Sequence, residues 1–109
     1  MIQQTTAHIL MVRPAAFGYN QQTAVNNTFQ EQPTGESQED IARRARVEFD
    51  GLVHLLRAAG INIIVVEDTE EPRKPDAVFP NNWISTHPNG KVITYPMFAP
   101  VRRLERDNP

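Results

Sequence analysis

The side chains best suited to chemistry gather in one short segment, whose sequence at 75–83 is PDAVFPNNW. It carries the carboxylate of Asp76 and the carboxamides of Asn81 and Asn82, just before a run that is typical of a strand. Polar side chains at the junction of a loop and a strand often form a binding site in α/β proteins. The segment is also typical of a turn bracketed by prolines, in which these side chains satisfy nearby backbone groups. Both interpretations stay open.

A second segment, YPMFAPVRR at 95–103, ends in the neighbouring arginines Arg102 and Arg103. Its prolines stiffen the backbone, and the two arginines stand near the start of an expected helix. An arginine in such a place can hold a carboxylate through two parallel N–H groups. The alternative is an exposed basic pair to which nothing is bound.

Within these 109 residues there is no cysteine, and the histidines are His8, His54 and His87. The absence of cysteine excludes a disulfide, a thiolate metal site and a cysteine nucleophile from this stretch of chain. No two of the histidines have the spacing of metal ligands. We therefore expect neither a metal nor another cofactor.

The elements that must position these residues follow from the pattern of apolar side chains. The runs at 7–13 and 61–66 predict buried strands, and the stretch between Ser37 and Gly60 predicts a helix. This order of strand, helix and strand is typical of a crossover between parallel strands. The buried face of the helix is predicted to consist of Ile41, Ala45, Phe49, Leu52, Val53 and Leu56.

Further along, the runs 83–87 and 91–95 flank Asn89-Gly90 and predict a hairpin with a type I′ turn. Residues 101–107 resemble the first turns of a second helix, and we expect residues 1–109 to be the N-terminal part of a longer protein. The long stretch 14–34 has no periodicity but contains aromatic residues. These side chains either serve a functional loop or anchor it to the core; they are Phe17, Tyr19 and Phe29.

Composition limits the class of protein. A chain of 109 residues with 39% hydrophobic and 22% charged residues has room for one small globular domain. Its net charge of −2 lacks the basic excess of a nucleic-acid binder. No apolar run approaches the ~20 residues that cross a membrane, so we expect a cytoplasmic protein.

Taken together, the two segments resemble the amidinotransferase/dimethylarginine dimethylaminohydrolase superfamily, also called penteins. Dimethylaminohydrolases have an Asp-x-x-Phe-x-Glu-Asp pattern and a later Pro-Gly-Ala-Pro-Ser-Arg-Arg segment. Here DAVFPNN at 76–82 and PMFAPVRR at 96–103 stand at the matching places. The Asn-Asn pair and the Arg-Arg-x-Glu-Arg run at 102–106 are most similar to the branch of citrulline hydrolases. The resemblance implies an α/β fold, with one ββαβ-type blade and the start of a second from a five-bladed α/β-propeller.

The resemblance also implies the roles of individual residues. Asp76, Asn81 and Asn82 would face the guanidino or ureido group of a small amino-acid substrate, with Phe79 packed near it. Arg102 would hold the substrate carboxylate. The family's cysteine nucleophile would lie outside these residues, so the chain by itself is expected to be inactive.

The Asn-Asn pair departs from the Glu-Asp of the family pattern, and this favours citrulline. A guanidinium offers only N–H donors, which suit carboxylates, whereas a ureido group offers donors and a carbonyl acceptor that an amide can match. Two other functions stay open: a stand-alone, non-catalytic α/β module that binds an amino-acid carboxylate, and amidino transfer. We expect self-association through exposed blade edges, since unpaired edges favour it.

Overall fold

The computed structural model describes residues 5–18 and 37–107. Its elements follow in the order β1 (His8–Arg13), α2 (Gln38–Ala58), β2 (Asn62–Glu67), the 3-10 helix η1 (Pro80–Asn82), β3 (Ile84–Thr86), β4 (Val92–Thr94), α3 (Pro100–Arg103) and the 3-10 helix η2 (Leu104–Asp107). Strands and helices are mixed, so the predicted α/β class is confirmed. The predicted propeller blade stays a prediction.

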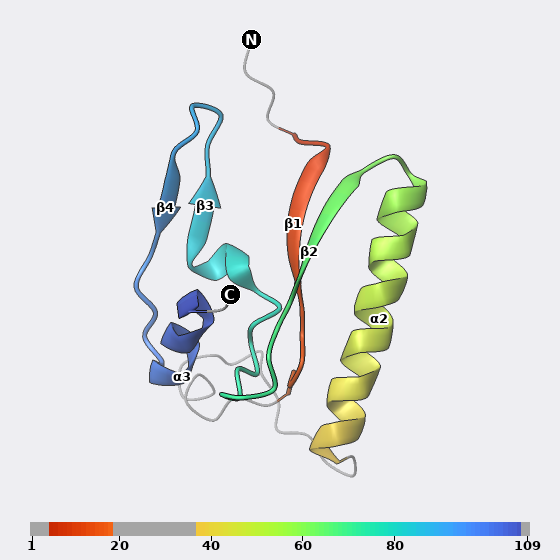
Figure 1. The fold of residues 1–109 in the computed structure, drawn as a ribbon, viewed down its shortest axis with the longest axis vertical. Helices are drawn as coiled ribbons and strands as arrows, with labels where there is room; N and C mark the ends of the chain where they lie inside the picture. Colours follow the sequence, from red (N-terminus) through yellow and green to blue (C-terminus); the bar gives the residue numbers. More distant parts are fainter. Residues whose placement is uncertain (1–4, 19–36, 108–109) are drawn as a thin grey trace.

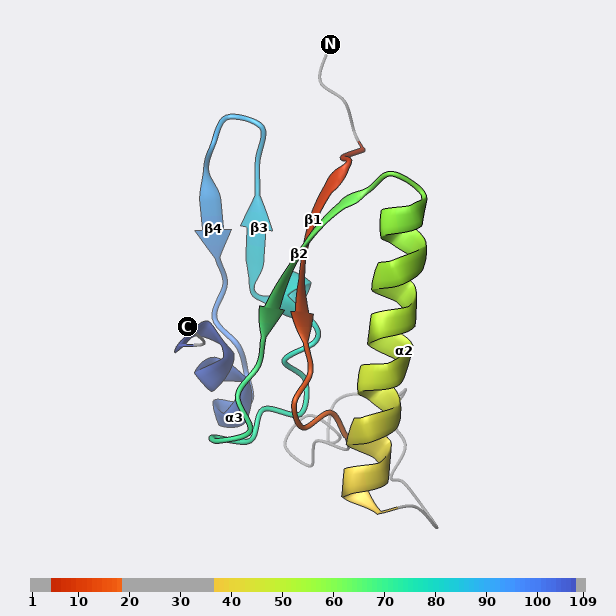
Figure 2. The same ribbon diagram turned by 45° about the vertical axis from the view of Figure 1, so that its right-hand side comes forward.

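Helix α2 runs alongside the pair β1–β2, while the hairpin β3–β4 and helix α3 lie on the side of these strands away from α2 (Figure 1). Figure 2, turned by 45°, shows the same arrangement. The strands form two separate two-stranded sheets, β1–β2 and β3–β4. Within the described ranges, no helix has the length and hydropathy that crossing a bilayer requires.

Strands β1 and β2 are parallel, as the order strand, helix, strand predicted, but the prediction that they are buried holds for one face only: Leu10 and Ile64 on the other face are 52% and 54% exposed. Leu10 pairs with Ile64 and Val12 with Val66 in their register. The β-branched residues of β2 favour the extended conformation, and α2 provides the length of chain that a parallel connection needs.

Both ends of α2 are fixed by the residues that predicted them. The hydroxyl of Ser37 accepts a hydrogen bond from the backbone N–H of Asp40 at 3.1 Å. At the other end, Gly60 has φ +90 and donates to the carbonyl of Arg57, while Ile61 donates to that of Leu56, both at 3.0 Å. This pair of bonds is the Schellman motif, and its positive φ is easily adopted by glycine.

The core lies between α2 and the sheet. Phe49 and Val53 of α2 pack against Ile63 of β2, and partly buried residues surround them. The predicted burial of Leu52 is wrong: its side chain is 48% exposed, whereas Ala42 is buried. A sheet of only two strands covers a narrow stripe of the helix, so an apolar residue at the flank of that stripe stays in contact with water.

The hairpin β3–β4 is antiparallel as predicted, but its predicted turn type is wrong. A type I′ turn needs positive φ at Asn89 and Gly90, and only Gly90 has it, at +83. Gly90 donates to the carbonyl of His87, and His87 donates to that of Lys91, both at 3.0 Å. This pattern is a type I turn followed by a glycine bulge. Pro88 explains it, because its fixed φ near −65° suits the first central position of a type I turn.

The predicted second helix over 101–107 is confirmed as a helical segment, although only its first part is α-helical. Helix α3 starts with Pro100 at its first turn, where a missing N–H costs nothing. The chain then tightens into the 3-10 helix η2. This end of the molecule also carries the loop from β2 to η1, and the two segments meet at the candidate site.

Candidate functional site

Arg102 is the centre of a buried polar cluster. Its side chain is folded inward from α3, and the residue is only 7% exposed. The Nε atom donates to Oε2 of Glu105 at 2.8 Å, and Nη2 donates to Oε1 at 3.0 Å. Glu105 is 2% exposed, so the pair is a bidentate ion pair almost without contact to water.

The same guanidinium reaches back to the segment 76–82. Its Nη1 donates to Oδ1 of Asn82 at 2.8 Å, and its Nη2 lies 3.4 Å from the carbonyl oxygen of Asp76 and 3.3 Å from that of Phe79. The Asp76 carboxylate is 3.9 Å from Nε. The structure therefore brings together four of the residues predicted for the site, from two segments 20 or more residues apart.

The bond from Arg102 fixes how the Asn82 amide is turned. A guanidinium has N–H donors and no acceptor, so the oxygen of the amide must face it. The Nδ2 group of Asn82 therefore points away from Arg102, and the residue is exposed. Asn82 thus offers a hydrogen-bond donor at the surface of the site.

The segment 74–83 has its shape because of consecutive tight turns. The backbone N–H groups of Ala77, Phe79 and Asn82 donate to the carbonyls three residues before them, at 3.0–3.1 Å. Pro80 occupies the first turn of η1, where proline fits best. These backbone bonds leave the side chain of Asn82 for Arg102. The segment is thus the turn that the alternative interpretation predicted, but the side chain of Asn82 bonds to Arg102 rather than to a nearby backbone group.

Phe79 and Asn81 occupy the exposed side of this segment. Phe79 is 41% exposed, and its ring meets the ring of Phe17 edge to face, with centroids 6.2 Å apart. The start of the stretch 14–34 thus lies against the site, whereas Tyr19 and Phe29 are outside the described residues. Asn81 is exposed on η1.

Arg103 behaves differently from its neighbour. It is exposed, and it donates from Nε to the carbonyl of Met97 and from Nη2 to that of Phe98, both at 2.8 Å. These bonds brace the turn into α3. The alternative of an exposed basic pair with nothing bound is wrong, because Arg102 is buried and both arginines have partners in this chain.

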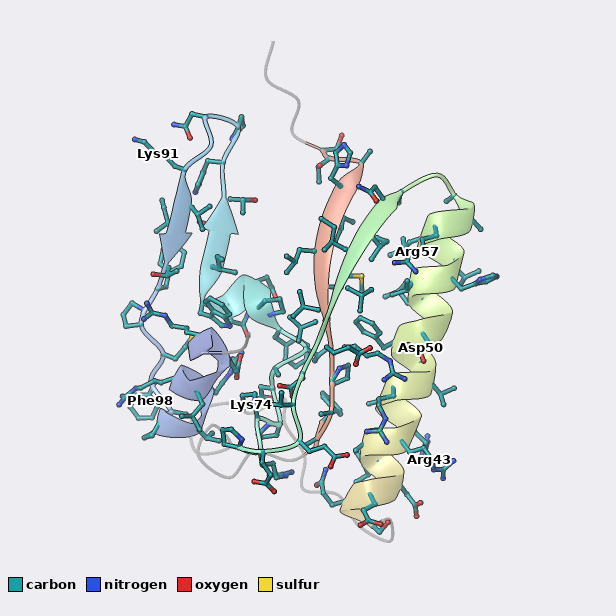
Figure 3. The ribbon with its side chains drawn as sticks, viewed as in Figure 1. Arg43, Asp50, Arg57, Lys74, Lys91 and Phe98 are labelled. Atoms are coloured by element: carbon teal, nitrogen blue, oxygen red, sulfur yellow. The ribbon has the colours of Figure 1, made fainter. Side chains whose placement is uncertain are left out.

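A second buried ion pair lies in the loop that leads from β2 to Asp76. The sequence did not predict it. The Lys74 ammonium lies 3.1 Å from Oδ1 of Asp68, and the two side chains are 2% and 0% exposed. Lys74 also donates to Thr69 Oγ1 and to the carbonyl of Pro72, both at 2.9 Å. Figure 3 shows Lys74 on the loop after β2, at the end of the molecule that carries α3. The pair closes this loop and holds the residues that precede Asp76.

Glu105 was also missed, although a signal was present. It follows Arg102 by three residues, a spacing that places two side chains on the same face of a helix. The sequence reasoning had no signal that the pair faces inward.

Another polar cluster joins α2 to the sheet. Arg13 holds Asp50 through two N–O contacts of 2.9 Å and lies 3.5 Å from Glu67. This ion pair lowers the pKa of Asp50, mainly through the hydrogen bonds from Arg13. The cluster borders a hollow of about 430 Å³ between α2 and β2. Among residues 5–18 and 37–107, no group of three or more acidic or histidine side chains could hold a metal ion.

Comparison with known families relates this chain to a family of hydrolases. The family model described as N,N dimethylarginine dimethylhydrolase, eukaryotic, matches residues 13–109, which include every residue of the cluster around Arg102. Neither curated proteins nor solved structures yielded a match. The match covers most of the chain and confirms the resemblance found in the two segments. The chain belongs to the dimethylarginine dimethylhydrolase family.

Proposed function

We propose that these residues form the substrate-binding part of a C–N hydrolase that acts on a ureido or guanidino amino acid. The family match supports the reaction class. The 109 residues contain no cysteine, so the cysteine nucleophile that the resemblance implies lies outside them. They are the N-terminal part of a pentein domain in this proposal.

The observation that carries the substrate assignment is the orientation of the Asn82 amide. Its oxygen is bonded to Arg102, which leaves Nδ2 to donate toward a ligand. A ureido group has a carbonyl oxygen that accepts this bond, whereas a guanidinium has only donors. The name of the matched family points to dimethylarginine. The Asn-Asn pair at 81–82 points instead to citrulline, which we propose as the preferred substrate.

The neighbouring side chains complete the proposed site. Asp76 is buried beside Arg102, and its carboxylate can accept from the N–H groups that ureido and guanidino substrates share. The exposed part of Phe79 would pack against the planar reacting group. Asn81 would supply the second amide.

Arg102 needs a different role from the direct one implied by the resemblance. Its Nε, Nη1 and Nη2 atoms all donate to groups of this chain. A bidentate clamp on a substrate carboxylate would require the guanidinium to leave Glu105 or Asn82. We therefore propose that Arg102 acts on the substrate through Asn82.

Steady-state kinetics of the full-length protein test this proposal. Citrulline, arginine and dimethylarginine are supplied separately, and released ammonia or dimethylamine is measured. We expect the highest kcat/KM with citrulline, and no turnover by the 109-residue chain alone. Absence of turnover with all three substrates would contradict the hydrolase and favour a binding module. Turnover that depends on an added amine acceptor would favour amidino transfer.

A further inference from the structure

Glu105 is bonded to Arg102, and Arg102 in turn is bonded to Asn82 in the segment 79–82. Both of its carboxylate oxygens accept from Arg102, at 2.8 and 3.0 Å, and it is 2% exposed. A buried ion pair of this kind contributes little net stability compared with an apolar pair of similar size. The effect of the Glu105–Arg102 pair is therefore sought in the orientation that it gives to the guanidinium.

The guanidinium is a rigid plane, so fixing one edge fixes the other. Glu105 holds the edge that contains Nε and Nη2, and this aims Nη1 at Oδ1 of Asn82, 2.8 Å away. The amide of Asn82 is in turn held with its oxygen inward. A chain of two contacts thus runs from a buried carboxylate to an exposed amide donor.

We propose that Glu105 is a positioning residue that sets the substrate preference of the site through Arg102 and Asn82. This inference rests on the proposed function above. With Glu105 in place, the site presents an N–H donor and accepts a ureido oxygen. With the pair weakened, Arg102 is free to turn, and the Asn82 amide can flip and offer its oxygen to a guanidinium instead. Glu105 would therefore favour citrulline over arginine without touching either.

The substitution Glu105→Gln tests this in the full-length protein. Glutamine has nearly the same size, but its amide nitrogen faces an N–H of Arg102 and cannot accept from it. The control is Asp50→Asn, which weakens the ion pair with Arg13 on the side of the strands that faces α2, away from α3 and the cluster around Arg102. Where Glu105→Gln does not fold, Glu105→Asp, which keeps the charge but shortens the side chain, is measured in its place.

The readout is the ratio of kcat/KM for citrulline to that for arginine. Loss of one aligned hydrogen bond to the ureido oxygen should lower this ratio about tenfold in the Glu105 variant. The ratio should be unchanged in Asp50→Asn, even though that variant is also less stable. Wild-type protein that turns over neither substrate would refute the proposed function. A wild-type enzyme that prefers citrulline, together with a folded Glu105 variant of unchanged ratio, would overturn the positioning role alone.

Discussion

Arg102 Nη1 donates a hydrogen bond to Oδ1 of Asn82 at 2.8 Å, and this bond joins helix α3 to the segment that follows β2. Glu105, at 2.8 Å, is the nearer of two carboxylates that neutralise the buried charge of Arg102. The first prediction concerns this pair. Glu105→Ala should lower the free energy of unfolding by about 3–5 kcal/mol, since it leaves a buried guanidinium without its partner.

The double variant Arg102→Met, Glu105→Leu removes both charges. Its loss in the free energy of unfolding should be much smaller than the sum of the losses in the single variants Arg102→Met and Glu105→Leu. Urea unfolding of the two single variants and of the double variant measures the coupling. Strict additivity would contradict a direct interaction between the two side chains.

Two glycines should respond to alanine in opposite directions. Gly51 lies within α2, where an added Cβ meets nothing within 4 Å, so Gly51→Ala should stabilise the protein by about 0.5–1 kcal/mol. Gly90 has equal space around it but a φ of +83. Gly90→Ala should therefore destabilise the hairpin by about 1–2 kcal/mol, through backbone strain alone. The urea midpoints of the two variants, compared with wild type, show whether each is more or less stable. A change in the same direction in both would contradict the prediction.

The pair Arg13–Asp50 should make stability depend on pH in acid. Because Arg13 lowers the pKa of Asp50 in the folded state, the pair's contribution is fully present above the unfolded pKa, near 4. It is lost as the pH falls through the lower folded pKa. Asp50→Asn should therefore be less stable than wild type at about pH 6, and the difference should shrink as the pH falls below about 4. Urea midpoints across this range measure it, and a constant difference would contradict the assignment.

Self-association of the 109-residue chain is the fourth prediction. Leu10 and Ile64 pair in the sheet and are 52% and 54% exposed, on the face opposite the core residues Ile9 and Ile63. Such apolar surface favours contact with another copy. Light scattering should show association that falls in the double variant Leu10→Thr, Ile64→Thr. The control exchanges Val47 and Leu55, which are exposed on α2, for Thr and Gln. An equal decrease in self-association in both double variants would contradict a contact through the exposed face of β1 and β2.

Local signals account for the parts of the fold that the sequence predicted. Ser37 and Gly60 mark the ends of α2 because each satisfies backbone groups within its own turn. The parallel pairing of β1 and β2 follows from a helix of sufficient length between two apolar runs. The turn of the hairpin was predicted wrongly, although its signal was also local. Pro88 favours a type I turn, and this preference outweighs the preference of Asn89-Gly90 for type I′.

Four residues of the cluster around Arg102 could be predicted from the sequence, but Glu105 and the contacts within the cluster could not. The motifs identified Asp76, Phe79, Asn82 and Arg102, and the structure brings these four together. The inward turn of Arg102 depends on burial by segments distant in sequence, which no local pattern reports. For the same reason no local pattern indicates the buried ion pair between Lys74 and Asp68.

The substitution Asn82→Asp in the full-length protein tests the central claim most directly. Aspartate has the shape of asparagine and can still accept from Arg102, but it replaces the outward N–H donor with an acceptor. Once the bound substrate excludes water, this acceptor and the ureido oxygen face each other without a proton between them, at a cost of about 1–3 kcal/mol. Asn81→Asp is the control, because it adds the same charge one residue away, at a side chain without this bond to Arg102.

Asn82→Asp should lower kcat/KM for citrulline about ten- to hundredfold, at about 1.4 kcal/mol per decade. Arginine should lose less or gain, since it offers only donors to the new carboxylate. Asn81→Asp should shift the ratio of the two kcat/KM values less. The ratio in Asn82→Asp should therefore move toward arginine. A ratio that stays constant or moves toward citrulline would contradict the claim that Asn82 recognises a ureido group.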